Sequence, residues 1–272
     1  CQRELAGLAA LLEKADVSFA NLLEGLDTYT ASYGAYMTPE KIRDEIEIQE
    51  TVLECDPKKV VVAHRIGKLA MTLGEWKQAI AVFSKYIETG YPPILRDLGV
   101  ALTQEHIQEP ESEAYRQGQH YLELASDDKY HDADAIASLA STWRTRDAER
   151  TRALYRRAYE IDPTEPYAVS NFLVSEIASQ QNMTPVALMT PAIHTAMQRC
   201  RDQAQVGMNL PWAHYNLGLY QLLMEKPNES LLAYAKAIQV STHSWMIETS
   251  LRMLGRLEVV RHLIPGYEWA RR

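Results

Sequence analysis

Residues 60–92, VVVAHRIGKLAMTLGEWKQAIAVFSKYIETGYP, contain the pattern that decides the fold. Two apolar stretches flank Gly74: the first contains Gly67, and the second contains Ala79 and Phe83, four residues apart. Apolar residues at this spacing share one face of a helix, and nothing here alternates apolar with polar residues as a half-buried strand does. The segment therefore predicts two short helices with a turn between them, and the proline that ends it marks the boundary to the next unit.

The pattern returns along the chain at intervals close to the length of this segment. Gly99 follows Gly67 by 32 residues. Further copies of its parts are recognisable at Leu98-Gly99, at Tyr155, Ala158 and Asp162-Pro163, in residues 166–179, and at Leu217-Gly218, Tyr234 and Ala237. A period of this length indicates a repeat architecture, in which each unit buries its apolar face only by stacking on its neighbours.

These residues resemble the tetratricopeptide repeat, whose motif has L-G in a first helix, A-x-x-x-F in a second helix, and then a proline. The resemblance covers about residues 58–242, and in the unit at 92–127 Gly118 and Leu122 stand in for Ala and Phe. It implies an all-α fold, a right-handed superhelical array of antiparallel helix hairpins, and we expect about five hairpins. In this motif small residues let paired helices approach closely, and Phe83 fills the gap between one hairpin and the next.

The chain divides into a cap, a repeat array and a short continuation. We expect an N-terminal helical cap at 1–57, with helices at about Gln2–Leu26 and Pro39–Cys55, the array at 58–262, and the start of a truncated C-terminal continuation at 263–272. Insertions are expected near 108–115 and 180–208, where polar stretches and prolines interrupt the period. The second insertion is long enough for an extra or elongated helix.

Two interpretations of Cys1 are open. A mature bacterial lipoprotein begins with a lipid-modified cysteine, but the residues after Cys1 run directly into the helical pattern that includes Leu5 and Leu12, which leaves no flexible tether. We therefore expect a fragment excised from a longer chain. The aromatic residues close to the last position, Tyr267 and Trp269, agree with that expectation.

The composition argues against several classes of protein. A chain with 46% hydrophobic and 24% charged residues is typical of a folded soluble protein. A formal net charge of −8 does not provide the basic face that nonspecific nucleic-acid binding needs, so we expect no nucleic-acid partner. No apolar run approaches the roughly 20 residues that span a bilayer, and the 3 cysteines are too far apart to indicate a disulfide framework or a zinc site. We expect a cytoplasmic protein without membrane contact.

The sequence carries none of the common catalytic signatures, neither a phosphate-binding Gly-rich loop nor G-x-S-x-G, so we expect no enzymatic activity and no cofactor. The densest set of possible metal ligands is Asp127, Asp128, His131, Asp132 and Asp134. These residues lie between two expected helices, where carboxylates commonly cap free amide groups. The set also lacks the Gly and the distal Glu of a calcium-binding loop, so we predict helix capping and no metal site.

One cluster of cations stands out as a possible anion-binding patch. It comprises Arg144, Arg146, Arg150, Arg152, Arg156 and Arg157. Arginine forks suit phosphates and carboxylates, so such a patch could bind an acidic peptide or nucleic acid. The alternative is a solvated helix face, which Asp147 and Glu149 partly compensate, and we favour it slightly.

The tetratricopeptide resemblance implies that the first helix of each hairpin lines a concave groove for a protein or peptide partner. Alignment on Gly67 and Gly218 places seven residues on this surface: His64, Lys68, Met71, Trp212, Tyr215, Leu219 and Leu222. Some relatives clamp a peptide carboxylate with Lys and Asn at set positions. Here those positions hold His64, Lys68 and Asp97, so the pattern fails and we expect no clamp of that kind.

The leading hypothesis is a non-catalytic protein–protein interaction scaffold, or a sensor segment of a larger signalling or effector protein. One alternative is a receptor for a small ligand or signal peptide, in which the superhelix closes around its ligand. A second alternative is the regulatory part of an enzyme whose catalytic domain lies outside this chain. A closed, pocket-like groove at Trp212 and Tyr215 would favour the receptor, and an open groove would favour a protein partner.

Overall fold

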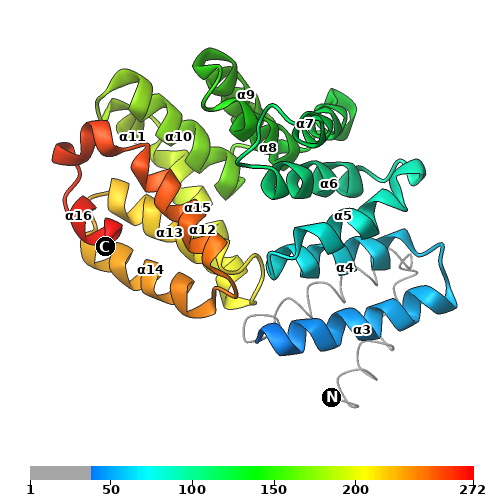
Figure 1. The fold of residues 1–272 in the computed structure, drawn as a ribbon. Helices are drawn as coiled ribbons and strands as arrows, with labels where there is room; N and C mark the ends of the chain where they lie inside the picture. Colours follow the sequence, from blue (N-terminus) through cyan, green and yellow to red (C-terminus); the bar gives the residue numbers. More distant parts are fainter. Residues whose placement is uncertain (1–37) are drawn as a thin grey trace, which may run out of the picture.

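The computed structural model of the chain describes residues 38–272 and contains helices and turns, with no strand in that range. The α-helices are α3 (Pro39–Cys55), α4 (Val60–Thr72), α5 (Trp76–Ser84), α6 (Pro92–Glu105), α7 (Glu113–Ala125), α8 (Ala133–Trp143), α9 (Ala148–Ile161), α10 (Pro166–Gln180), α11 (Thr184–Leu188), α12 (Thr190–Gln205), α13 (Trp212–Leu223), α14 (Pro227–Val240), α15 (Ser244–Gly255) and α16 (Tyr267–Arg271) (Figure 1). Three 3₁₀ helices lie at Ile87–Thr89, Asp128–Tyr130 and Glu258–Leu263. The all-α prediction is confirmed.

Two further observations concern the expected N-terminal cap and membrane-spanning helices. The helix expected at Gln2–Leu26 lies outside the described residues, whereas α3 has the expected bounds and packs against α4. Among residues 38–272, none of the helices combines the length and the apolar character that a membrane crossing requires.

Ten of the described α-helices pair into five hairpins: α4 with α5, α6 with α7, α8 with α9, α10 with α12, and α13 with α14. The short helix α11 fills the link between α10 and α12, so residues 180–208 contribute the second helix of the fourth hairpin. Residues 108–115 form the turn before α7 and its first residues. Residues 108–115 thus lie at a turn between paired helices, and residues 180–208 supply a helix of the array itself.

Local sequence determines where several helices begin. Ser112, Asp132 and Asp147 each precede a helix and accept a hydrogen bond from the amide three residues ahead, at 3.2, 2.9 and 2.9 Å. Such caps satisfy amides that have no partner within the helix. Prolines open α6, α10 and α14, where a missing amide hydrogen costs nothing.

The motif glycines mark the closest approaches within hairpins. A Cβ atom on Gly67 would lie 2.1 Å from Cε1 of Phe83, and one on Gly218 would lie 3.1 Å from the Tyr234 ring. In the second hairpin, a Cβ atom on Gly99 would lie 2.8 Å from the carbonyl oxygen of Gly118. Each glycine therefore gives the facing helix room for an aromatic ring or its backbone.

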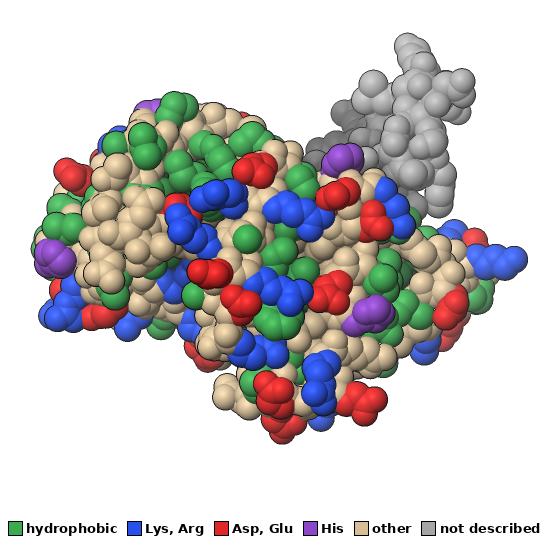
Figure 2. Space-filling model, turned by 90° about the horizontal axis from the view of Figure 1, so that it is seen from above, with side chains coloured by type: hydrophobic (Ala, Val, Ile, Leu, Met, Phe, Trp, Pro, Cys, Tyr) green, Lys and Arg blue, Asp and Glu red, His purple; other side chains and the backbone are tan. Residues whose placement is uncertain are grey.

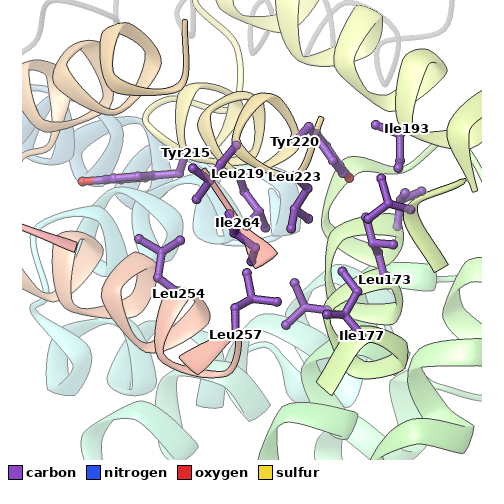
Figure 3. Close-up of a cluster of buried hydrophobic side chains, with 14 of the residues drawn as sticks. Leu173, Ile177, Ile193, Tyr215, Leu219, Tyr220, Leu223, Leu254, Leu257 and Ile264 are labelled. Carbon is purple, nitrogen blue, oxygen red and sulfur yellow. The ribbon is translucent and has the colours of Figure 1, made fainter. Parts of the chain in front are cut away.

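The largest buried cluster joins successive units into one core. It includes Leu173 and Ile177 of α10, Ile193 of α12, and Leu219 and Leu223 of α13, with Leu254 and Leu257 added by α15 and the turn that follows (Figure 3). No single hairpin contains this core. The stability of the array therefore depends on contacts between neighbours, as in other helical repeats.

The array curves until its last helices meet its first (Figure 1). Thr242, just before α15, donates its hydroxyl to the carbonyl oxygen of Thr72 at the end of α4, at 2.8 Å. The rings of Trp76 and Trp245 lie 4.9 Å apart between centroids. Gly74 has φ +72°, and a Cβ atom there would lie 3.2 Å from Cδ1 of Trp245, so glycine permits this close passage. These contacts join the two ends of the array.

Candidate functional site

The closed array surrounds a central cavity of about 300 Å³. Its walls come mainly from α4, α6, α8, α10 and α13, the first helices of the five hairpins, and from α15, which follows the last hairpin. Tyr234 of α14 and the loop residues Asn209 and Leu210 complete the lining. Five of the seven residues predicted for the groove line the cavity: Lys68, Met71, Trp212, Tyr215 and Leu219. The structure therefore brings together residues from the first and the fifth hairpins, which are about 150 positions apart in sequence.

The two other predicted groove residues have different positions. Leu222 is only 1% exposed and belongs to the core between units. His64 places Nε2 2.7 Å from Oδ2 of Asp97, in the network at the edge of the cavity.

One side of the cavity is an aromatic wall. The Trp212 ring lies 5.3 Å from Trp245 and 5.8 Å from Tyr215, and Tyr215 lies 6.3 Å from Tyr234, measured between centroids. The Tyr215 hydroxyl lies 2.9 Å from Oγ of Ser241. These rings, with Met246 beside them, give a peptide or small ligand an apolar surface, since aromatic side chains dominate many binding interfaces.

The opposite side contains a network centred on a buried carboxylate. Asp97 is 2% exposed; its oxygens lie 2.9 Å from Nε of Arg96, 2.7 Å from His64 and 3.6 Å from Nζ of Lys68. Burial alone would raise the pKa of Asp97, but Arg96, Lys68 and His64 together hold that pKa well below its ordinary value. Arg96 also binds Asp132, with Nη1 3.0 Å from Oδ2. This part of the network is internally neutralised.

Two further carboxylates, Asp134 and Glu165, line the cavity beside that network. Both also line a second hollow of about 360 Å³. Arg199 reaches Glu165 at 3.0 Å and Asp162 at 3.0 Å. Burial and the neighbouring Asp134 raise the pKa of Glu165 to about 7, against the opposing effects of the Tyr167 amide and Arg199. Burial also raises the pKa of Asp134.

The arginines of the predicted anion-binding patch are distributed over several contacts. Arg152 and Arg156 both lie near Glu176, at 2.5 and 3.7 Å. Arg150 binds Glu123 at 3.2 Å, and Arg157 binds Asp128 at 2.6 Å. Arg146 lies 3.8 Å from Glu111 and 4.7 Å from the centroid of the Trp143 ring. Of the six, Arg144 alone has no ion pair within residues 38–272. On the face seen in Figure 2, basic and acidic side chains are intermingled.

The predicted capping set also has definite positions. Asp132 caps α8, and Asp127 accepts from the Lys129 amide at 3.0 Å. Asp134 caps nothing and faces the cavity instead. Within residues 38–272, no group of three or more His, Cys, Asp or Glu side chains is arranged to hold a metal ion.

Sequence reasoning missed the residues that α15 and α10 contribute. Trp245 follows Trp212 by 33 residues, so the repeat period itself could have placed it on the cavity wall. Glu165 precedes a proline at the start of a predicted helix, and in that position a carboxylate is most simply interpreted as a cap. Its amide contact is present, since Oε1 accepts from Tyr167 at 3.2 Å, but its place on the cavity follows only from the curvature of the array.

No protein-family model and no curated protein matches the chain. Among solved structures, it is similar over 98% of its length to a chain of the APC/C hetero-tetramer Cut9-Hcn1, with 12% identity and a TM-score of 0.50. The fold is that of a tetratricopeptide array. This chain covers 51% of the Cut9-Hcn1 chain, about half of its length. It is also similar to YrrB, described as a TPR protein with an unusual peptide-binding site, over 72% of this chain and 93% of that chain, with 15% identity and a TM-score of 0.41.

Proposed function

We propose that this tetratricopeptide array is a non-catalytic interaction module that binds a short, extended segment of a partner protein in its central cavity. The observation that carries the proposal is the closure of the array, which turns the groove into a cavity with an aromatic wall and a charged wall. A concave site with an apolar lining and a few converging polar groups is the usual form of a ligand site.

The size of the cavity limits what it accepts. An α-helix is about 10 Å wide and rises 5.4 Å per turn, so one turn occupies about 400 Å³. The cavity has a volume of about 300 Å³, which we expect to accept a few residues of a partner and not a long helix. An extended segment of a few residues suits it better.

A second candidate is a receptor for a small ligand, which a closed, pocket-like groove at Trp212 and Tyr215 favours; both residues line the cavity, and Trp76 and Trp245 join the two ends of the array. Its volume of about 300 Å³ is at the lower end of the range for small-molecule pockets. A sensor role within a larger signalling protein is compatible with either occupant.

A cavity-filling substitution tests the location of the site. Ser250 lines the cavity on α15, and we expect Ser250→Trp to weaken binding of a blocked, fluorescein-labelled random octapeptide pool at least about tenfold, because the indole occupies the peptide's volume. Ser179 is exposed on α10, so Ser179→Trp is the matched control and should bind as the wild type does. Fluorescence anisotropy measures both.

The outcomes separate the two candidates. Equal binding by Ser250→Trp and the wild type would place the peptide site elsewhere. If no peptide pool binds, and native mass spectrometry of the wild type finds a small molecule that is absent from Ser250→Trp, the receptor is correct and the peptide proposal is wrong.

A further inference from the structure

The charges around the cavity do not balance. Three carboxylates line its acidic side, Asp97, Asp134 and Glu165, and two more, Asp132 and Asp162, line the adjoining second hollow. Three permanent cations face them: Lys68, Arg96 and Arg199. Two negative charges are therefore uncompensated when all these groups are ionised, and His64 is the nearby titratable group that contacts Asp97.

The missing partner is localised at Asp134. Arg96 is already bound to Asp97 and Asp132, Lys68 lies against Asp97, and Arg199 bridges Asp162 and Glu165. Asp134 forms no ion pair within residues 38–272. Its Oδ1 atom is buried and has no hydrogen-bond partner there. A buried carboxylate oxygen without a donor is costly, and the residue that carries it lines the cavity.

Helix capping does not account for this carboxylate. Asp132 accepts the Ala135 amide and Glu165 accepts the Tyr167 amide, so these two have a structural role. Asp134 lies inside the first turn of α8 and makes no such contact. Removing it would leave the helix cap intact.

The cavity contains a second unsatisfied group of the opposite kind. The indole Nε1 of Trp245 is buried without an acceptor in residues 38–272, and Trp245 belongs to the aromatic wall. An extended peptide offers a backbone carbonyl to such a donor. The apolar wall also suits the methylene stem of a long basic side chain, whose head remains charged.

We infer that the segment bound in the central cavity carries a lysine or arginine side chain, with its cationic head against Asp134 and Glu165 and its stem along the aromatic wall. The inference rests on the proposed peptide-binding function and names the chemistry of the peptide. It follows from the unpaired carboxylate, the charge imbalance and the shape of the cavity.

The proton affinities of the two carboxylates support this assignment. Burial raises the pKa of Asp134, and its acidic neighbours add to the effect of burial while Arg96 and Lys68 oppose it. The pKa of Glu165 is raised for the same reason. A cation placed between two such groups favours their ionised forms and stabilises the complex.

A peptide series tests the inference directly. Five labelled octapeptide pools carry Arg, Lys, Gln, Glu or Leu at one fixed central position, with equal mixtures elsewhere. We expect the Arg and Lys pools to bind about tenfold more tightly than the Gln pool, as expected for a charge-assisted hydrogen bond. Asp134→Asn should abolish this preference. Asp128→Asn, which removes an exposed carboxylate that does not line the cavity, should keep it.

The results distinguish this inference from the function on which it rests. If all five pools bind equally and Ser250→Trp loses binding, the inference of a basic side chain is wrong, but the proposal of peptide binding stands. Preference for the Glu pool, or an Arg preference that survives in Asp134→Asn, overturns the assignment as well. Binding by none of the pools contradicts both proposals.

The thermal stability of Asp134→Asn separates a binding role of Asp134 from a structural role, because the two roles predict changes in Tm of opposite sign. The pKa of Asp134 is raised in the folded state, so its ionised form costs stability above the pH at which it ionises in the unfolded chain. We expect Asp134→Asn to raise the Tm of the unliganded protein at pH 8 by about 2 °C or more. Asp132→Ala, which removes the cap of α8 and the ion pair with Arg96, should lower it. A lower Tm for Asp134→Asn would show that its carboxylate is already compensated and would overturn the inference.

Discussion

Replacing Phe83 with Ala is expected to lower the free energy of unfolding by about 3 kcal/mol. The Phe83 ring is fully buried, and its edge occupies the space that a Cβ atom on Gly67 would need. Its removal leaves a cavity between α4 and α5 that Gly67, with no side chain, cannot fill. Chemical denaturation followed by circular dichroism measures the change.

The matched control for this substitution is Leu232→Ala on α14. Leu232 is 66% exposed, so its truncation should change the free energy of unfolding by less than about 0.5 kcal/mol. A loss at Phe83 no greater than the loss at Leu232 would show that the repeat motif is misaligned in the first hairpin.

Replacing Tyr215 with Ala is also expected to cost about 3 kcal/mol of folding free energy, although Tyr215 lines the cavity. Tyr215 is only 6% exposed, packs near Tyr234 and Trp212, and places its hydroxyl 2.9 Å from Oγ of Ser241. It is therefore both a wall of the site and a part of the core. Differential scanning calorimetry follows the loss.

Two substitutions separate these roles. Tyr215→Phe keeps the ring and loses only the hydroxyl contact, so we expect a cost of about 1 kcal/mol. Trp212→Ala should cost less stability than Tyr215→Ala, because Trp212 is less buried, and it should still weaken peptide binding. A Tyr215→Ala protein as stable as the wild type would show that this ring is not part of the core.

The repeat motif was sufficient to predict the fold and several cavity residues. The spacing of Gly67, Ala79 and Phe83 is a local property, and the packing of Phe83 on Gly67 follows from it. Alignment on two glycines also placed Lys68 and Trp212 on the same surface, since equivalent positions in stacked units face the same side.

Closure of the array could not be predicted in this way. It depends on small rotations accumulated over five hairpins and on contacts such as Trp76 with Trp245, which are far apart in sequence. The same holds for the arginines. Their local sequence indicates a dense basic patch, but Arg152 and Arg150 find Glu176 and Glu123 on other helices.

The role of Asp134 shows where local reasoning stops. Asp132 and Asp134 are equally good capping candidates in sequence, and only one cap is needed for α8. The helix begins at Ala133, so Asp132 takes the cap and Asp134 is turned toward the cavity. Two positions in the sequence thus separate a structural carboxylate from a candidate binding residue.

The closed array is the central claim, and the separation of its two ends in solution tests it most directly. Nitroxide labels are attached at Lys77→Cys and Ser244→Cys, which are exposed neighbours of Trp76 and Trp245, after the native cysteines have been replaced by serine. The continuous-wave electron paramagnetic resonance spectrum of the double-labelled protein should show strong dipolar broadening relative to the two single-labelled proteins. A spectrum equal to the sum of the single-labelled spectra would mean that the array is open in solution, and the central cavity would not exist there.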